Sequence, residues 1–196
     1  MSELTQDALD QIFLNARTRN GWQDKPLPDK LLREIYDIAR MGPTTANSQP
    51  QRIVFVVSPQ AKAKLSPALS EGNRDKTMQA PAVAIFAYDL QFYDLLPKVF
   101  PHNQEARSWF VGKDAHIKET AFRNGSLQAA YFMIAARAKG LDCGPMSGFD
   151  QAMVNQAFFP DGRWKANFIC SLGYGTDERL FARSPRLSFE EACKVV

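Results

Sequence analysis

Histidine and cysteine are scarce in this sequence, and their scarcity limits the chemistry it can carry. The chain has only His102 and His116, and its three cysteines, Cys143, Cys170 and Cys193, form no CxxC pair. A multi-histidine zinc or iron site is therefore excluded, and the Cys/His spacings of a structural zinc site are missing. An odd number of widely spaced cysteines predicts a reducing cytoplasm, with the thiols buried as small hydrophobic side chains.

Long apolar runs and nucleotide-loop signatures are also missing. No run approaches the ~20 apolar residues of a membrane span, and the first residues, MSELTQDALD, lack the basic and apolar parts of a signal peptide. No GxSxG, GxxxxGKS/T or GxGxxG occurs, and Gly173-Tyr174-Gly175 is interpreted as a strand end. A charge of +3 and a pI near 8.8 suit anionic small molecules, whereas nucleic acid would need a denser basic patch.

The composition is that of one globular domain. Hydrophobic residues make up 45% and charged residues 23% of the 196 residues, which is typical of a soluble globular domain with one core. No internal repeat, low-complexity run or linker divides the chain, so we expect a single domain over residues 1–196.

One stretch, MGPTTANSQPQRIVFVV at residues 41–57, joins a helix to a strand through a polar loop. Residues 53–57 are β-branched or aromatic throughout and predict a buried strand. The short hydroxyl and amide side chains of the loop have two possible roles. They can bond their own backbone in a turn, or offer neutral donors and acceptors to a flat polar heterocycle.

Helical patterns flank this stretch on both sides. Residues 7–16 predict a short amphipathic helix, and Pro28-Asp29 starts another. The second has one apolar stripe that we assign to the core: Leu31, Leu32, Ile35, Ile38 and Ala39. Residues 117–139 form the longest helical pattern, apolar almost all round and ended by Gly140, as expected of a central helix or a subunit interface.

The remaining core signals come from two strands and two helix caps. Residues 83–88 and 167–173 are apolar enough for central strands. Asp150 is placed to cap a following helix, and Ser188 with Glu191 has the spacing of a capping box.

Basic residues gather near the two ends of the chain. In ARTRNGW, residues 16–22, two arginines flank a threonine, which is either a compact anion site or a solvated basic turn. The polar tail, residues 176–196, carries Arg179, Arg183 and Arg186, and we expect it to lie on a second chain.

Two internal segments allow both a functional and a plain interpretation. Asn73 and Lys76, three residues apart, share a face if their segment is helical, and otherwise form a polar turn. Residues 90–118 are irregular and aromatic, either an active-site lid or substrate wall, or a loop that merely covers the domain.

Taken in order, these motifs resemble the FMN-dependent nitroreductases over nearly the whole chain. The phosphate-binding turn, the PSxxNxQPW-like loop, the Asn-x-x-Lys pair, GPMSGFD and the basic RSPRL all have counterparts in that family. The resemblance implies an α+β fold: a three-layer α/β/α sandwich with a mixed, mainly antiparallel sheet. It also implies an intertwined homodimer with a C-terminal extension and FMN in two clefts between subunits, the GPTTANSQP loop coming from one chain and GPMSGFD from the other.

The same resemblance implies which residues bind FMN. Arg17, Thr18 and one or both of Arg183 and Arg186 would hold the phosphate, and Lys76 would stabilise the reduced flavin. Backbone N–H groups near Ser147 and Gly148 would face its N5 atom. The implied cofactor-binding set is Arg17, Thr18, Asn20, Thr44, Thr45, Asn47, Gln49, Asn73, Lys76, Pro145, Met146, Ser147, Gly148, Arg183 and Arg186. Asn20 stands where many relatives have a basic residue, so part of the phosphate-binding charge must come from the tail.

Within the family, RTRNGW, FPH, ARSWF and PRLSFEEA resemble the branch of malonic semialdehyde reductases, which form 3-hydroxypropanoate during pyrimidine degradation. We therefore expect an NADH- or NADPH-dependent oxidoreductase with ping-pong kinetics. A broad quinone or nitro-compound reductase and a non-catalytic FMN-binding dimer are the alternatives. Arg107 or Arg123 would hold a substrate carboxylate or serve as a surface arginine, and no residue is identified as the proton donor.

Overall fold

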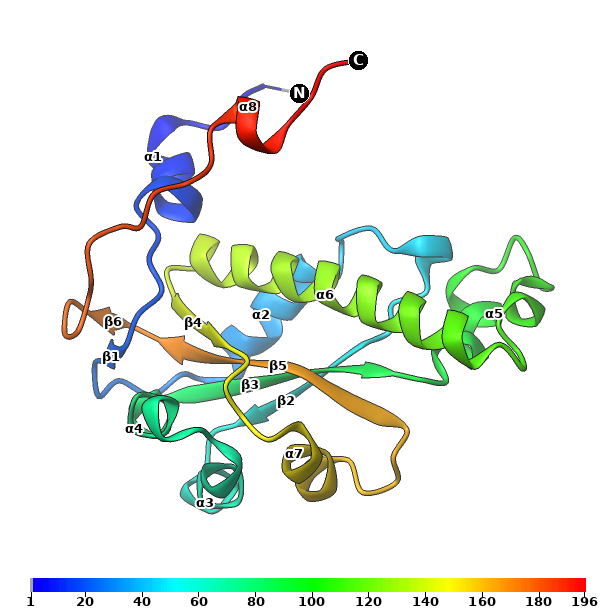
Figure 1. Ribbon diagram of the computed structural model, residues 1–196, viewed down its shortest axis with the longest axis horizontal. Helices are drawn as coiled ribbons and strands as arrows, with labels where there is room; N and C mark the ends of the chain where they lie inside the picture. Colours follow the sequence, from blue (N-terminus) through cyan, green and yellow to red (C-terminus); the bar gives the residue numbers. More distant parts are fainter. Residues whose placement is uncertain (1) are drawn as a thin grey trace.

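An antiparallel sheet of four strands forms the centre of the computed structural model, which describes residues 2–196 (Figure 1). The strand order is β2-β3-β5-β4. The strands are β2 (Gln51–Val56), β3 (Ala82–Asp89), β4 (Asp142–Met146) and β5 (Trp164–Gly173). All pairings within this sheet are antiparallel, where the sequence predicted a mixed, mainly antiparallel one. A parallel contact occurs at the isolated bridge between Thr18 and Cys143.

The two strands predicted as buried differ in their environment. All eight residues of β3 are buried, because β3 has a strand on each side and helices on both faces. β2 is an edge strand, and only its last residue is fully buried. The prediction of a buried strand at residues 53–57 was therefore wrong about burial, and Val57 lies beyond the strand with 39% of its surface exposed.

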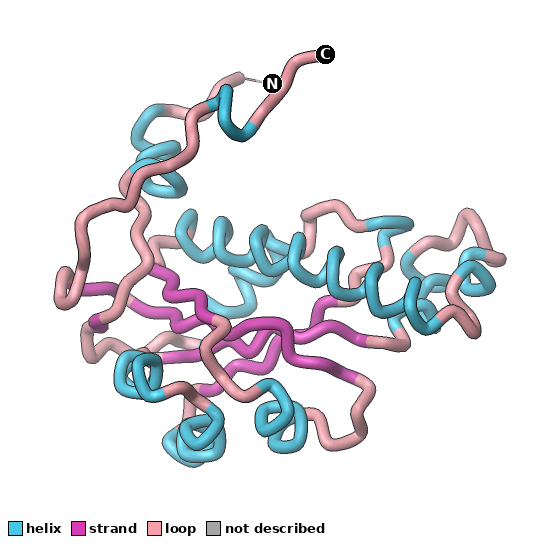
Figure 2. Tube along the Cα trace, in the orientation of Figure 1, coloured by secondary structure: helices cyan, strands magenta, loops and turns pink. Residues whose placement is uncertain are grey.

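Helices cover both faces of the sheet (Figure 2). α2 (Asp29–Ala39) and α6 (Asp114–Ala138) lie on one face. α3 (Pro59–Leu65), α4 (Glu71–Gln79) and α7 (Gln151–Phe158) lie on the other. This arrangement confirms the predicted three-layer sandwich.

The other elements are short. They are α1 (Gln6–Leu9), the π-helical turn η1 (Asp10–Leu14), β1 (Gly21–Trp22), η2 (Thr45–Asn47), η3 (Ser66–Ala68), η4 (Phe92–Leu95), α5 (Leu96–Val99), η5 (Ala106–Trp109), β6 (Gly175–Thr176) and α8 (Phe189–Ala192). No helix in residues 2–196 combines the length and apolar character that crossing a membrane requires.

The predicted stripe of α2 enters the core except at one position. Leu32, Ile35 and Ala39 are buried in the cluster that α2 and α6 share with the sheet. Ile38 is 48% exposed, so its assignment to the core was wrong. At 100° per residue, Ile38 lies on the outer edge of the stripe, turned away from the sheet.

The long helix α6 starts three residues earlier than predicted and ends as predicted. Gly140 follows it with φ +79°, the left-handed conformation that glycine adopts without a Cβ clash. One face of α6 is open to solvent, with Phe122 50%, Leu127 47% and Tyr131 41% exposed. The helix is therefore not buried all round within one chain.

Residues 90–118 form a compact unit with a core of its own. Phe92, Leu96, Ala106 and Phe110 are buried against Ile117 of α6. The segment therefore contains short helical turns where the sequence predicted an irregular loop. It lies at the N-terminal end of α6 (Figure 1).

The two ends of the chain leave the body together as an arm, defined here as residues 2–16 and 179–196 (Figure 1). The Ser188 capping box opens α8 with both of its hydrogen bonds, as predicted. Cys143 and Cys170 are buried, whereas Cys193 is exposed on the arm, so the prediction of a buried thiol was wrong there. Within residues 2–196, the arm contributes no residue to the buried core that could cover this side chain.

Candidate functional site

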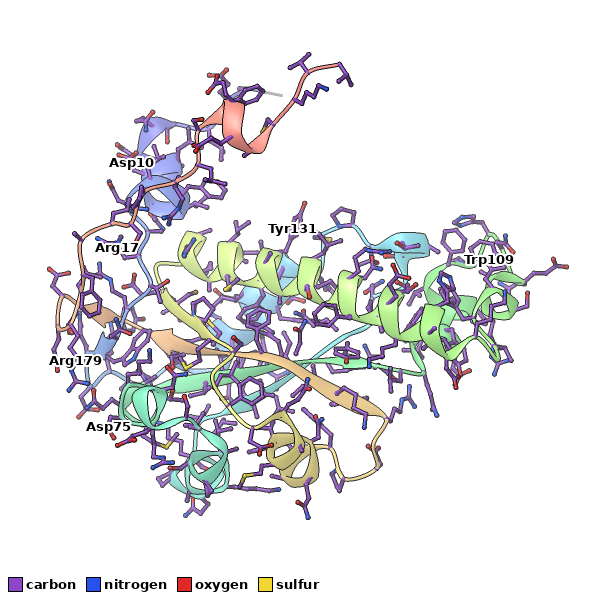
Figure 3. The ribbon with its side chains drawn as sticks, in the orientation of Figure 1. Asp10, Arg17, Asp75, Trp109, Tyr131 and Arg179 are labelled. Atoms are coloured by element: carbon purple, nitrogen blue, oxygen red, sulfur yellow. The ribbon has the colours of Figure 1, made fainter. Side chains whose placement is uncertain are left out.

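Residues from both ends of the chain line one cavity of about 380 Å³, where the arm meets the body. Figure 3 shows Arg17 at this junction. Four residues predicted to hold the phosphate line the cavity, Arg17, Thr18, Arg183 and Arg186, together with Asn20 of the predicted cofactor-binding set. The other lining residues are Phe13, Ala16, Arg137, Leu180, Phe181, Ala182 and Ser184. Folding thus gathers the predicted phosphate-binding residues, which lie more than 160 positions apart at the extremes.

Close backbone crossings fix this junction. β1 pairs with β6, and a Cβ on Gly21 would lie 2.4 Å from the Thr176 hydroxyl oxygen. A Cβ on Gly175 would lie 2.3 Å from Cγ of Arg19. Real Cβ atoms do not approach so closely, so a larger residue at either position would force the neighbouring side chain to shift. These crossings and the Thr18–Cys143 bridge hold the ARTRNGW turn against the sheet.

Hydrogen bonds from arginines tie the arm to the cavity. Arg17 donates to the carbonyl oxygen of Phe181. Arg183 donates to the carbonyl oxygens of Leu14 at 2.6 Å and Ala16 at 3.0 Å. These contacts are to neutral carbonyls, so the guanidinium charges are not neutralised by them.

The neighbouring Arg19 has a different role. It pairs with Asp142 at 3.4 Å and with Asp177, and it does not line the cavity. Burial lowers the pKa of Arg19, but the hydrogen bond to Asp177 and the charge of Asp142 more than offset this, so the pKa is raised. Both nearby carboxylates are therefore paired with Arg19. Among residues 2–196, the lining of the cavity contains four arginines and no acidic residue.

Arg137 is the cavity residue that the sequence interpretation missed. It sits in the last turn of α6, within a pattern assigned to an apolar helix. The signal that could have identified it is a single arginine in the apolar run before Gly140. A charge that interrupts a buried helix face is usually paired or faces a polar site.

A second group of predicted residues meets between α4 and the end of β4. Asn73 donates its side-chain N–H to the carbonyl oxygen of Gly148 at 3.0 Å, and the Ser70 hydroxyl donates to the same oxygen at 2.8 Å. A Cβ on Gly148 would lie 2.4 Å from the Asn73 amide nitrogen. A side chain at position 148 would therefore displace Asn73, which explains the glycine without a ligand.

Lys76 and the backbone after β4 lie beside this contact. α4 is helical, so Asn73 and Lys76 share a face as predicted. Lys76 has no ion pair within residues 2–196, and its carbonyl oxygen accepts a hydrogen bond from the Trp22 indole at 2.9 Å. β4 contains Pro145 and Met146 and ends at Met146. Among the backbone hydrogen bonds of loops and turns in residues 2–196, none is donated by the N–H group of Ser147 or Gly148.

The third group, the loop of Thr44, Thr45, Asn47 and Gln49, is held in a strained conformation. Ala46, Asn47 and Gln49 have φ of 49°, 48° and 42°. This left-handed conformation costs Ala46 and Gln49 roughly 1–2 kcal/mol each, whereas asparagine adopts it more readily. Side chains outside the loop hold it: Asn124 accepts from the Thr45 N–H at 2.8 Å. Strain that the surroundings impose in this way is common at functional sites.

The loop lies away from the cavity in the same chain. It contacts α6 at Asn124, and the cavity contacts α6 at Arg137. Thirteen residues separate these positions, which is about 20 Å at 1.5 Å per residue. Within one chain, therefore, the loop lies apart from the cavity. Among residues 2–196, the second group does not line the cavity either.

The two candidate substrate arginines lie on the surface. Arg107 pairs with Asp94 at 2.9 Å, with 50% and 40% of the side chains exposed. Arg123 pairs with Glu119 one turn before it on α6. Neither lines the arginine-rich cavity, so in a single chain both have the plain role of surface ion-pair residues.

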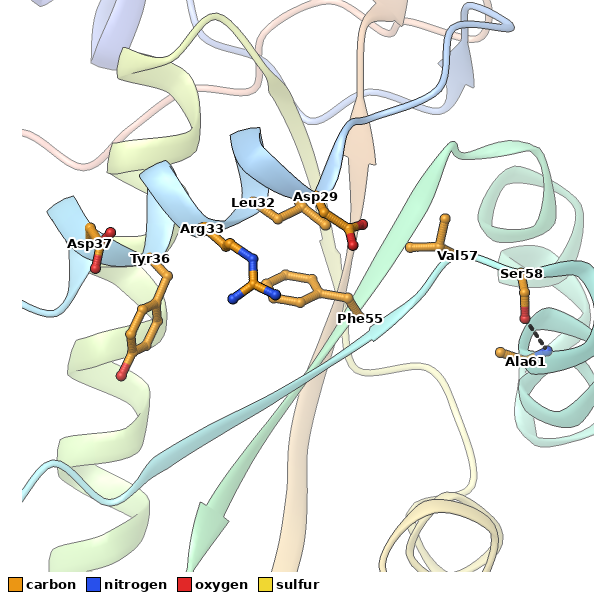
Figure 4. A pocket seen from close by; sticks show the side chains of 9 residues that line it. All are labelled: Asp29, Leu32, Arg33, Tyr36, Asp37, Phe55, Val57, Ser58 and Ala61. Atoms are coloured by element: carbon orange, nitrogen blue, oxygen red, sulfur yellow. Dashed lines mark hydrogen bonds between the residues drawn. The ribbon is translucent and has the colours of Figure 1, made fainter.

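A larger cavity, of about 790 Å³, lies elsewhere, between α2 and the edge strand β2 (Figure 4). Its lining includes Asp29, Arg33, Tyr36 and Phe55. None of the predicted site residues lines it. The chemistry expected from the sequence therefore points to the smaller, arginine-rich cavity.

Comparison with known proteins agrees with this fold. A model of the nitroreductase family matches residues 17–174. A protein of Ralstonia nicotianae, provisionally described as an NADH dehydrogenase/NAD(P)H nitroreductase, is 56% identical over 196 residues, covering 100% of each chain. One from Stenotrophomonas maltophilia with the same description is 57% identical over 188 residues, covering 96% of this chain and 95% of that one.

Solved structures with low sequence identity share the fold of this chain. A protein of Exiguobacterium sibiricum, provisionally described as a nitroreductase and crystallised in complex with FMN, has a TM-score of 0.85. It is 20% identical, and the alignment covers 100% of each chain. The chain belongs to the nitroreductase family. The family and fold implied by the sequence resemblance are thereby confirmed, and the semialdehyde branch stays a prediction.

Proposed function

We propose that the protein is an NADH- or NADPH-dependent oxidoreductase that binds FMN with its phosphate in the arginine-rich cavity. The observation that carries this proposal is the lining of four arginines without a carboxylate. A phosphate monoester carries about −1.5 to −2 charges near neutral pH and accepts several hydrogen bonds. Guanidinium groups and the Thr18 hydroxyl match these acceptors, so the residues present fit the group.

The direction of β4 relates the phosphate cavity to the second group of residues. Thr18 bridges Cys143 near the start of β4, and Ser147 follows its end. Four residues at about 3.3 Å each span about 13 Å. This spacing supports an elongated ligand with its phosphate beside Thr18 and its ring beside Ser147, Gly148 and Lys76.

In this arrangement FMN supplies the hydride chemistry through N5, and the protein supplies binding and orientation. Lys76 would stabilise negative charge on the reduced ring. The Ser147 and Gly148 N–H groups would donate to the ring edge. Asn73 would fix the Gly148 peptide through its hydrogen bond at 3.0 Å.

The proposal includes a homodimer in which the loop at residues 44–49 comes from the other chain. Support comes from the separation of about 20 Å along α6, which keeps the loop of one chain from its own cavity. The apolar face of α6 supports it too, with Phe122, Leu127 and Tyr131 exposed. Phe181 is 79% exposed on the arm, as expected if the arm packs on a partner.

Light scattering tests the dimer. Leu127→Glu places a charge on the open face of α6, and we expect monomers that lose FMN. Met153→Glu is the matched control, because Met153 is 41% exposed on α7, on the opposite face of the sheet. A Leu127→Glu protein that stays dimeric and retains FMN would contradict the proposed interface.

Flavin content and reduction test the core of the proposal. We expect a yellow purified protein with an FMN spectrum that bleaches when NADH or NADPH is added without oxygen. Arg17→Ala should lower FMN retention sharply. A protein that binds FMN and is never reduced would support the non-catalytic dimer in its place.

For the electron acceptor we propose malonic semialdehyde, which the sequence resemblance favours. The provisional descriptions of the relatives favour a second candidate, a broad nitro-compound or quinone reductase. Steady-state kcat/KM with malonic semialdehyde, menadione and a nitroaromatic distinguishes them. A kcat/KM for the semialdehyde below that for menadione would reject the first candidate. We also propose a cytoplasmic location, since Cys143, Cys170 and Cys193 are all free thiols.

A further inference from the structure

We propose that Arg137 binds the phosphate directly and supplies the cation that Asn20 does not. This inference rests on the proposed function, because it concerns the same cavity. It adds a residue from the end of α6, about 120 positions from Arg17, that no sequence motif indicated.

The first support is the hydrogen-bonding state of the Arg137 side chain. One terminal nitrogen, Nη1, donates to the carbonyl oxygen of Ile12 at 3.2 Å. Nε is shielded from solvent and has no hydrogen-bond partner within residues 2–196. Nε and Nη2 form the edge of a guanidinium that donates two parallel hydrogen bonds to a carboxylate or phosphate. The bond to Ile12 leaves this edge without a protein acceptor.

A buried N–H without a partner is unfavourable, so it requires an explanation. Arg137 lines the arginine-rich cavity, where an anion would supply the missing acceptor once a small shift of the side chain uncovers Nε. Its Nη1 bond and the bond from the Gln11 amide to the Arg137 carbonyl oxygen, at 2.7 Å, fix the end of α6 to the arm. The end of α6, and with it the backbone of Arg137, is thus held in place before any ligand binds.

The second support is the charge around the cavity. Asp142 and Asp177 both pair with Arg19, which lies outside the lining. Arg137 has no carboxylate partner within residues 2–196. Its charge is therefore available to the cavity.

The third support is the position of Asn20. Its side-chain N–H donates to the carbonyl oxygen of Arg179 at 3.2 Å, so Asn20 binds the tail and carries no charge. Arg137 enters the same cavity from a different element, the end of α6. With Arg19 paired to carboxylates and Asn20 neutral, the ARTRNGW turn provides the cavity with one cation, Arg17, and Arg137 adds another from across the cavity.

Titration of flavin-free protein with FMN and riboflavin tests this role, because the two ligands differ only in the phosphate. We expect Arg137→Ala to raise the Kd for FMN about 10- to 100-fold, about 1.4–2.8 kcal/mol, and to leave the riboflavin Kd unchanged. Arg137→Lys should restore part of the loss. Arg40→Ala is the control, since Arg40 is also an arginine at a helix end but pairs with Asp37 on the surface.

An equal loss of FMN and riboflavin binding would overturn the proposal, because it would mean that Arg137 acts only by holding the arm. Unchanged FMN binding would overturn it too.

Inorganic phosphate added to the flavin-free protein gives a readout without flavin. We expect phosphate to raise the Tm of the wild type more than that of Arg137→Ala. If the wild type binds no FMN but shows this difference, the proposed function fails while Arg137 is supported as an anion-binding residue. If phosphate stabilises both proteins equally, the role of Arg137 is rejected, whatever the result of the FMN titration.

Discussion

Substitution of Asp89 by Asn tests how the fold supports the loop at residues 44–49. The Asp89 side chain is fully buried at the end of β3. It accepts four hydrogen bonds, two from Arg163 at 2.8 and 2.7 Å, one from Arg52 at 2.8 Å and one from the Gln91 N–H at 2.8 Å. Arg52 in turn donates to the carbonyl oxygen of Gln49 at 2.9 Å. Asp89 therefore positions the arginine that holds the end of the strained loop.

The magnitude follows from this environment. Asparagine keeps the shape of the side chain but removes the charge and turns one acceptor into a donor that faces a guanidinium. Breaking a buried ion pair costs about 3–5 kcal/mol. Arg163 is 36% and Arg52 18% exposed, so water solvates part of the released charge. We therefore expect a loss of stability at the low end of this range, about 3 kcal/mol. For a chain of this length, that loss lowers the Tm by roughly 6–12 °C.

Acid sensitivity gives a second measure of the same interaction. Burial raises the pKa of Asp89, but hydrogen bonds from Arg163 and the Gln91 N–H and the charges of both arginines outweigh it, so the pKa is lowered. The stabilisation is thus complete above the pKa of the unfolded chain, near 3.9, and is lost as the pH falls through the lower pKa of the folded chain. The Asp89→Asn protein should lose less stability than the wild type below about pH 4.

Denaturant unfolding at fixed FMN concentration, from pH 7 down to pH 3, measures both effects, because bound ligand would otherwise add to stability. Asp94→Asn is the control, since its pair with Arg107 is half exposed and should be worth less than about 1 kcal/mol. The reasoning fails if Asp89→Asn and Asp94→Asn lose the same stability at pH 7. It also fails if Asp89→Asn unfolds in acid as steeply as the wild type.

Three further predictions follow from single contacts. Gly148→Ala should break the Asn73 and Ser70 hydrogen bonds, because its Cβ would lie 2.4 and 2.9 Å from their side-chain atoms. We expect denaturant unfolding to show a free energy of unfolding lower by about 1–3 kcal/mol, together with weaker FMN binding. A Cβ on Gly140 would meet no atom within 4 Å, so only the φ of +79° opposes Gly140→Ala. Calorimetry should show a loss of stability of about 1–2 kcal/mol with flavin binding unchanged. Unchanged stability would argue against backbone strain at this position. Lys76→Gln should lower the flavin reduction potential by about 20 mV for each kcal/mol of lost charge stabilisation, measured by anaerobic redox titration; an unchanged potential would remove Lys76 from the ring.

Much of the local structure could be predicted from the sequence, because its signals are local. Apolar runs at residues 83–88 and 167–173 identified the central strands β3 and β5, and Asp150 and Ser188 cap their helices as expected. Burial was less predictable, because it depends on which elements become neighbours. The strand at residues 53–57 lies at the sheet edge, and Cys193 lies on an arm with no core beneath it.

The sequence by itself determined the central strands and main helices, the family and the residue types of the phosphate site. The Arg-Thr-Arg turn and the basic tail carry cations whatever the fold. Only the tertiary structure decided which arginines share the cavity. Arg19, within the motif, is neutralised by Asp142 and Asp177, whereas Arg137, from an apolar helix, enters the lining. Charge pairing depends on distances of a few ångströms between segments remote in the chain, and these distances exist only after folding.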